Sequence, residues 1–217
     1  MRQLRFPHDA AVERLCRQLG DFVAAVRSLD DLQLLAPSRC VGWSRLEVVV
    51  HVRMGLEEMA VGTTRRVDAV PDHDAASYWR THPDDRDDDE VPHIPWLRRV
   101  ASAHSRPSGA VRHLEAVAKT ATGAVRAMPA GVVEFQGKRM LTGDFLATWV
   151  VELAVHQLDL ALDDEPSGAD WARQTLEALA EHSLPSELDD ATAVLVGLGR
   201  VPCPATTRLD PAFPLAL

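Results

Sequence analysis

Residues 145–162 read FLATWVVELAVHQLDLAL, a run that is apolar on nearly every face but contains Glu152, His156 and Asp159. A run of this length and character predicts a helix buried in the core of a domain. A buried carboxylate is costly unless it is paired or holds a cation. Glu152 and His156 are four residues apart, so their side chains share one helix face and can converge on one point. The stretch therefore predicts half of a metal site.

The best candidate for a third ligand is His51, in a second predicted helix that starts after Ser44 and extends to about Arg66. The sequence S-R-L-E at 44–47 is a capping box, which marks the start of that helix. Gly55 follows His51 by one turn, and a small residue there would leave room for a ligand beside the imidazole. Two histidines and one glutamate form a donor set that suits zinc and is tolerated by nickel, cobalt or iron.

Each of these residues also has an ordinary structural interpretation. A single histidine on an apolar helix face is usually a hydrogen-bonded core residue, and Glu152 could pair with an arginine of another helix. Asp159 could fix the tautomer of His156 by a hydrogen bond, or could be the first residue of its helix to meet solvent. From spacing alone, a metal site and a polar core cluster both remain open.

The apolar spacing is helical almost throughout the chain, which predicts an all-α fold built as a four-helix bundle. The segment VVEFQGKRML at 132–141 has a glycine between two short β-type runs, which predicts a small hairpin or extended segment before the metal-site helix. The other helices are expected at about 9–29, 107–128, 171–183 and 189–199, and a helical pattern also resumes around Trp96.

The segment 68–95 differs from the rest because it contains four prolines and the acidic run DDRDDDE. This composition predicts a long crossover loop, which we interpret as a solvated connector between helices of the bundle in preference to an active-site lid. We expect one helical, metal-binding domain over residues 1–200, with 68–95 as an acidic, proline-rich excursion. The proline-rich residues 201–217 are expected to form an irregular tail.

Composition excludes several classes of partner. The chain of 217 residues has a net charge of -9 and no basic stripe, which argues against nucleic acid. Three ionisable groups within 145–162 argue against a membrane helix, and the N-terminus lacks the apolar core of a signal peptide. Cys16, Cys40 and Cys203 form no CxxC motif. We therefore expect a cytoplasmic protein with reduced thiols.

Two separated motifs resemble a known family. The segment GWSRLEVVVHV at 42–52 resembles the signature GWT-x-x-D-V-V-A-H-L of mycothiol-dependent enzymes in the DinB-like superfamily, typified by maleylpyruvate isomerase. The segment GDFLATWVVELAVHQLDL at 143–160 resembles the family pattern D-[FY]-L-A-T-R-V-x-E-x-x-V-H-x-L-D-L, and VGLGR at 196–200 resembles its last bundle helix.

This resemblance implies a DinB-like four-helix bundle that binds a divalent metal, usually Zn²⁺, through His51, Glu152 and His156. In the family the metal activates the sulfur of a low-molecular-weight thiol, here expected to be mycothiol, for attack on a small electrophile. The chemistry then belongs to a thiolate or water held by the metal, and no protein base is assigned. Asp159 would orient His156.

The sequence departs from the family pattern in two respects. Trp149 stands where arginine is common, and Trp149 and Gly55 are the possible neighbours of the pocket. The two-domain isomerases also have a C-terminal α/β domain, whereas this sequence ends soon after Gly199. A thiol S-transferase or thiol-exchange enzyme is therefore expected rather than maleylpyruvate isomerisation itself.

Two other functions remain open on the same scaffold. The metal could activate water instead of a thiol, which would make the protein a hydrolase. Alternatively, the bundle could keep the metal for a structural or sensing role without catalysis. The protein is expected to act on small molecules as a monomer or homodimer, with neither nucleic acid nor membrane as a partner.

Overall fold

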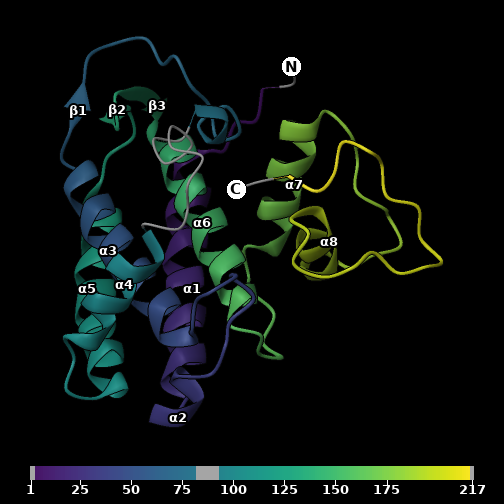
Figure 1. The fold of residues 1–217 in the computed structure, drawn as a ribbon. Helices are drawn as coiled ribbons and strands as arrows, with labels where there is room; N and C mark the ends of the chain where they lie inside the picture. The colour runs from purple at the N-terminus through teal and green to yellow at the C-terminus, as the bar shows by residue number, and fades with distance from the viewer. Residues whose placement is uncertain (1–2, 82–92, 216–217) are drawn as a thin grey trace.

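The computed structural model describes residues 3–81 and 93–215. Four long helices form the predicted bundle, in which α1 packs against α5 and α6, and α3 packs against the same two helices (Figure 1). These helices are α1 (His8–Arg27), α3 (Arg45–Gly62), α5 (Pro107–Ala127) and α6 (Thr142–Asp159). The all-α prediction is confirmed, since the sheet is small and lies at one end of the bundle.

Shorter helices complete the fold around this bundle. Two of them, α7 and α8, pack against each other and against α6, to the right of the bundle in Figure 1. Neither α2 nor η1 was expected from the sequence, because elements of three or four residues leave little periodicity. The shorter helices are α2 (Asp31–Leu34), η1 (Trp79–Thr81), α4 (His93–Ser102), α7 (Ala169–Ala180) and α8 (Asp190–Gly197).

The predicted hairpin is confirmed and joins a third strand. Strands β2 (Val132–Phe135) and β3 (Lys138–Leu141) are antiparallel, and β1 (Arg66–Val67) pairs with the free edge of β2. Gln136 and Gly137 form the turn with φ angles of 49° and 75°, the left-handed conformations that a two-residue hairpin requires. The turn chemistry was therefore visible in the sequence, whereas the two-residue strand β1 was not.

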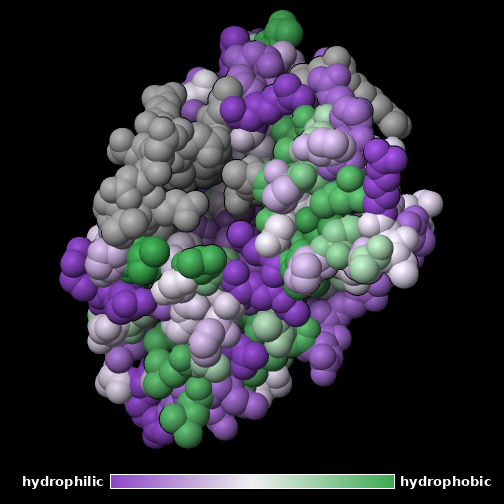
Figure 2. All heavy atoms as spheres, turned by 45° about the vertical axis from the view of Figure 1, so that its right-hand side comes forward, coloured by the Kyte–Doolittle hydropathy of each residue, from purple (hydrophilic) through white to green (hydrophobic). Residues whose placement is uncertain are grey.

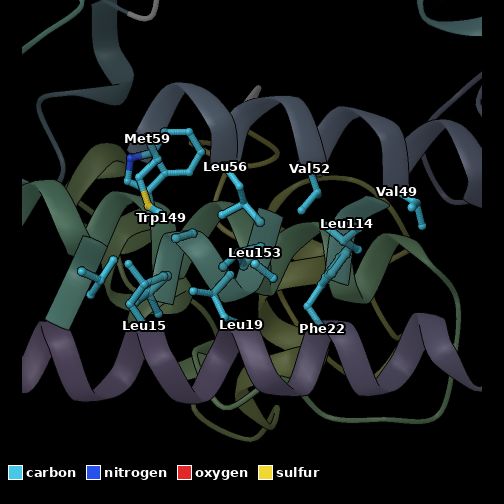
Figure 3. Packing of buried hydrophobic residues seen from close by; sticks show 14 of the residues in the cluster. Leu15, Leu19, Phe22, Val49, Val52, Leu56, Met59, Leu114, Trp149 and Leu153 are labelled. Atoms are coloured by element: carbon cyan, nitrogen blue, oxygen red, sulfur yellow. The ribbon is translucent and has the colours of Figure 1, made fainter. Parts of the chain in front are cut away.

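The apolar character of α6 on all sides has a structural reason. One face, which includes Leu146 and Leu153, lies in the core of the four-helix bundle, and Figure 3 shows Leu153 among side chains of α1, α3 and α5. Another face, with Val151 and Leu158, lies in a smaller core shared with α7 and α8. Because α6 is enclosed from both sides, most of its polar residues are buried with it, and Glu152 is half-buried.

The expectation of a solvated connector agrees with Val70, which is 79% exposed, but is wrong for most of residues 74–78. Ala75 and Tyr78 are buried, and the Tyr78 hydroxyl donates a hydrogen bond of 2.9 Å to Gln136 in the hairpin. Asp72 accepts hydrogen bonds from the backbone and side chain of Arg139. The segment thus packs on the hairpin and bundle because small apolar residues are interspersed with its polar ones. Residues 82–92 of the predicted excursion lie outside the described residues, and its last three residues, 93–95, are helical because α4 begins at His93.

The C-terminal segment returns to the smaller core. Its described part, residues 201–215, forms turns without a helix or strand. Phe213 is buried, and the Leu215 amide donates a hydrogen bond to the Gly197 carbonyl at 2.8 Å.

On the face drawn in Figure 2, hydrophobic and hydrophilic side chains are interspersed around a recess near the middle. Among the described helices, none combines the length and the apolar character needed to cross a membrane.

Replacing Ser44 with alanine is expected to lower the free energy of unfolding by about 1 kcal/mol. The Ser44 hydroxyl accepts from the Glu47 amide at 3.3 Å, and Glu47 accepts from the Ser44 amide at 2.6 Å, so the predicted capping box is present. Urea unfolding of Ser44→Ala beside Ser44→Thr, which keeps the hydroxyl, measures the effect. Equal stability of Ser44→Ala and wild type would contradict it.

Candidate metal centre

The three predicted ligands converge between α3 and α6. His51 Nε2 lies 3.1 Å from Glu152 Oε1, and His156 Nε2 lies 3.2 Å from the same oxygen. The two imidazole rings are 4.8 Å apart in an edge-to-face arrangement. The packing of α3 on α6 thus brings together residues that are 101 positions apart in the sequence.

These separations fit a bound cation. Bond lengths of about 2.0–2.2 Å to nitrogen and oxygen place two ligands of a tetrahedral site roughly 3.3–3.6 Å from each other. The measured distances of 3.1 and 3.2 Å are close to this range, and all three donor atoms lie within 4.8 Å of one another. A divalent cation could therefore be held with small side-chain movements, leaving a fourth position for another ligand.

The electrostatics of the cluster also suit a cation. Burial raises the pKa of Glu152, but His156 and His51 outweigh it and keep that pKa well below its usual value. Burial lowers the pKa of His156, but Glu152, Asp159 and Cys40 outweigh it and hold that pKa well above its usual value. A proton on His156 thus balances the carboxylates, and metal binding would displace that proton.

Asp159 lies on the opposite edge of the His156 ring, as the spacing predicted. Its side chain is fully buried, and Oδ2 is 3.3 Å from His156 Nδ1. Arg200 Nε donates to Oδ1 at 3.1 Å, and the Cys40 thiol donates to Oδ2 at 3.1 Å. Burial raises the pKa of Asp159, but His156 and Arg200 outweigh it and lower the pKa overall. The alternative that Asp159 meets solvent is wrong, since its side chain is fully buried between His156, Cys40 of the loop before α3 and Arg200 after α8.

An aromatic wall stands beside the ligands. The Trp43 ring centre is 5.1 Å from that of His51 and 6.5 Å from that of His156. Trp43 belongs to the GW pair of the first motif, but its contact with the imidazoles was not predicted. Nor were the contacts of Cys40 and Arg200 with Asp159. The only signal in the sequence was that all three lie in or near the motifs.

Trp149 and Gly55 lie against each other, and the space beside the glycine is filled. A Cβ added to Gly55 would lie 3.1 Å from Trp149 Cζ3, and the Trp149 side chain is 8% exposed. Figure 3 shows the Trp149 ring beside Met59 in the bundle core. The room expected next to His51 is therefore occupied by an indole, which packs in the core.

Comparisons with known proteins find the same family that the two sequence motifs resemble. The family model of the mycothiol maleylpyruvate isomerase N-terminal domain matches residues 12–161. Two solved structures share the fold, the mycothiol-dependent maleylpyruvate isomerase and a histidine-to-alanine mutant of it, with TM-scores of 0.56 and 0.54. Both are 14% identical, over 80% of this chain and 69% of theirs. No curated protein gives a significant match.

Proposed function

We propose, on the premise that this chain belongs to the family of the mycothiol maleylpyruvate isomerase N-terminal domain, that it is a metal-dependent enzyme that transfers a low-molecular-weight thiol to a small electrophile. The observation that supports this most strongly is the convergence of His51, Glu152 and His156 on one point. Mycothiol is the expected thiol, because a relative in the same fold depends on it.

Within this proposal the residues of this chain bind the cation and orient its ligands. Two imidazoles and one carboxylate form the ligand set, and zinc is the expected cation. A bound divalent cation would lower the pKa of an arriving thiol, so that the thiolate is present at neutral pH. Asp159, held by Arg200, faces Nδ1 of His156 at 3.3 Å and would orient its ring when the cation binds. Trp43 offers an apolar wall beside the two imidazoles.

The proposed reaction is a substitution at the electrophile. The thiol loses its proton to solvent, its sulfur forms a bond to carbon, and the leaving group departs with the bonding electron pair. Isomerisation is a second candidate, favoured by the family's name. There the thiolate adds to a carbon–carbon double bond, the resulting single bond rotates, and elimination of the thiolate restores the double bond.

Thiol binding at the centre is testable without knowledge of the electrophile. Cobalt-substituted protein titrated with mycothiol is expected to develop a thiolate-to-cobalt absorption band in the near ultraviolet. His51→Ala should weaken the response by at least about 100-fold, since losing even an outer partner of a metal ligand costs roughly 10–100-fold. His113→Ala is the matched control, because its side chain is 47% exposed on α5 and pairs with Glu57.

The outcomes separate the competing functions. A band that depends on added mycothiol and on His51 supports the thiol enzyme. A cobalt site whose spectrum does not change with mycothiol overturns it: cleavage of amide or ester substrates by that protein would indicate a hydrolase, and absence of both activities a structural or sensing metal.

A further inference from the structure

His156 presents its two ring nitrogens to two different sets of donor atoms. Nε2 faces Glu152 and His51, as described above. Nδ1 lies on the other edge, 3.3 Å from Asp159 Oδ2, and makes no well-directed hydrogen bond with any described residue although His156 is only 9% exposed. The Cys40 sulfur is 3.1 Å from the same Asp159 oxygen. A buried nitrogen, a carboxylate oxygen and a thiol therefore meet at a second point.

The geometry of this second cluster resembles that of a metal site. Cys40 Sγ, Asp159 Oδ2 and His156 Nδ1 all lie within 4.8 Å of one another. Bond lengths of about 2.3 Å to sulfur and 2.0–2.2 Å to nitrogen and oxygen correspond to ligand separations of roughly 3.3–3.7 Å in a tetrahedral site. The two measured separations, 3.1 and 3.3 Å, need little adjustment.

We propose that Cys40, Asp159 and the Nδ1 edge of His156 form a second cation site, one that takes a soft, thiol-seeking cation such as cadmium or a second zinc. Thiolate ligands select soft cations over magnesium or calcium. Cys40 binds as the thiolate and His156 through a deprotonated Nδ1, and both release their protons to solvent. With a cation also bound at Nε2, the ring would bridge the two cations as the imidazolate. The proposal goes beyond thiol transfer at the first centre and does not depend on it.

The surroundings keep the second set of donors in place and accessible. Arg200 occupies Oδ1 of Asp159, which leaves Oδ2 for the cation. The Cys40 amide donates to the Ser38 hydroxyl at 3.1 Å, so the backbone of the loop is fixed. Cys40 is half-buried and lines a cavity of about 740 Å³ together with Gly42 and Arg98. A cation can therefore reach the thiol from this cavity.

Cadmium titration of the metal-free full-length protein tests the site. A thiolate-to-cadmium band in the ultraviolet is expected at about one cadmium per chain, and Cys40→Ser should weaken the binding by more than the roughly 10–100-fold that loss of an outer partner costs. Cys16→Ser and Cys203→Ser are matched controls, since both residues are half-buried cysteines outside the cluster. Circular dichroism of each variant verifies the fold.

A second variant separates this site from the first. Glu152→Ala removes a ligand of the first centre but none of the second, so its cadmium band should persist and remain sensitive to Cys40→Ser. No thiolate band in the wild-type protein, or an equal band in Cys40→Ser, would overturn the second site. If the wild-type protein fails to bind cobalt or mycothiol but still shows the Cys40-dependent cadmium band, only the first centre is contradicted.

Discussion

His156→Ala protein is expected to retain less than about one tenth of the zinc that wild-type protein holds after dialysis against dilute zinc. The substitution removes Nε2, one of three donors, and leaves only His51 and Glu152, which do not make a closed ligand set. Since loss of an outer partner already weakens metal sites by roughly 10–100-fold, loss of a ligand should cost at least the upper end of that range. Elemental analysis of both proteins, with circular dichroism to verify folding, measures the effect.

Graded variants make this result specific. Asp159→Asn keeps all three ligands but replaces the carboxylate that faces His156 Nδ1, so zinc affinity should fall by about 10–100-fold without being abolished. His113→Ala should bind zinc as wild type does. Equal zinc content in wild type and His156→Ala would show that His51, Glu152 and His156 are polar core residues that share a proton.

The helices of the bundle and the three candidate ligands could be predicted because their signals are local. The capping box at Ser44 and the apolar spacing fix where α3 begins and which residues it buries. The four-residue interval from Glu152 to His156 places both side chains on one face of α6. His51 was chosen as the third candidate ligand for its place among valines in a predicted helix and for its match to the first family motif, and the structure places its Nε2 3.1 Å from Glu152 Oε1.

The surroundings of the ligands could not be predicted because they are produced by tertiary packing. Arg200 follows Asp159 by 41 positions and Cys40 precedes it by 119, and no periodicity connects positions so far apart. Similarly, the acidic and proline-rich composition around residues 68–81 indicated a loop but concealed Ala75 and Tyr78, whose burial depends on the hairpin. Trp149 differs again, since its place in the second motif, where arginine is common, suggested a pocket neighbour, whereas its side chain packs in the core.

Gly143→Ala is expected to destabilise the protein strongly. A Cβ at Gly143 would lie 2.1 Å from the Phe6 carbonyl oxygen and 3.0 Å from the His8 nitrogen. Both are backbone atoms, so no side-chain rotation relieves the clash. Overpacking usually costs about 1–3 kcal/mol, and a backbone clash of this severity should reach or exceed the upper value. That corresponds to a fall in Tm of roughly 6–12 °C for a chain of this size.

The segment that would have to move is held on both sides of the clash. Asp144 accepts from the Phe6 amide at 3.0 Å and pairs with Arg5 at 2.5 Å. Displacing the segment would therefore break contacts to a fully buried carboxylate, which is costly because the charge would lose its partners. α1 begins directly after this segment and packs along α6, so the change also disturbs the helix pair that supports Glu152.

Gly123→Ala provides the matched control, because Gly123 is also helical but a Cβ there meets no atom within 4 Å. Alanine is a better helix former than glycine, so this variant should gain about 0.5–1 kcal/mol. Thermal unfolding of the two variants beside wild type should thus give shifts of opposite sign. A Tm for Gly143→Ala at or above the wild-type value would mean that the approach of Phe6 to α6 is not as tight as the structure has it.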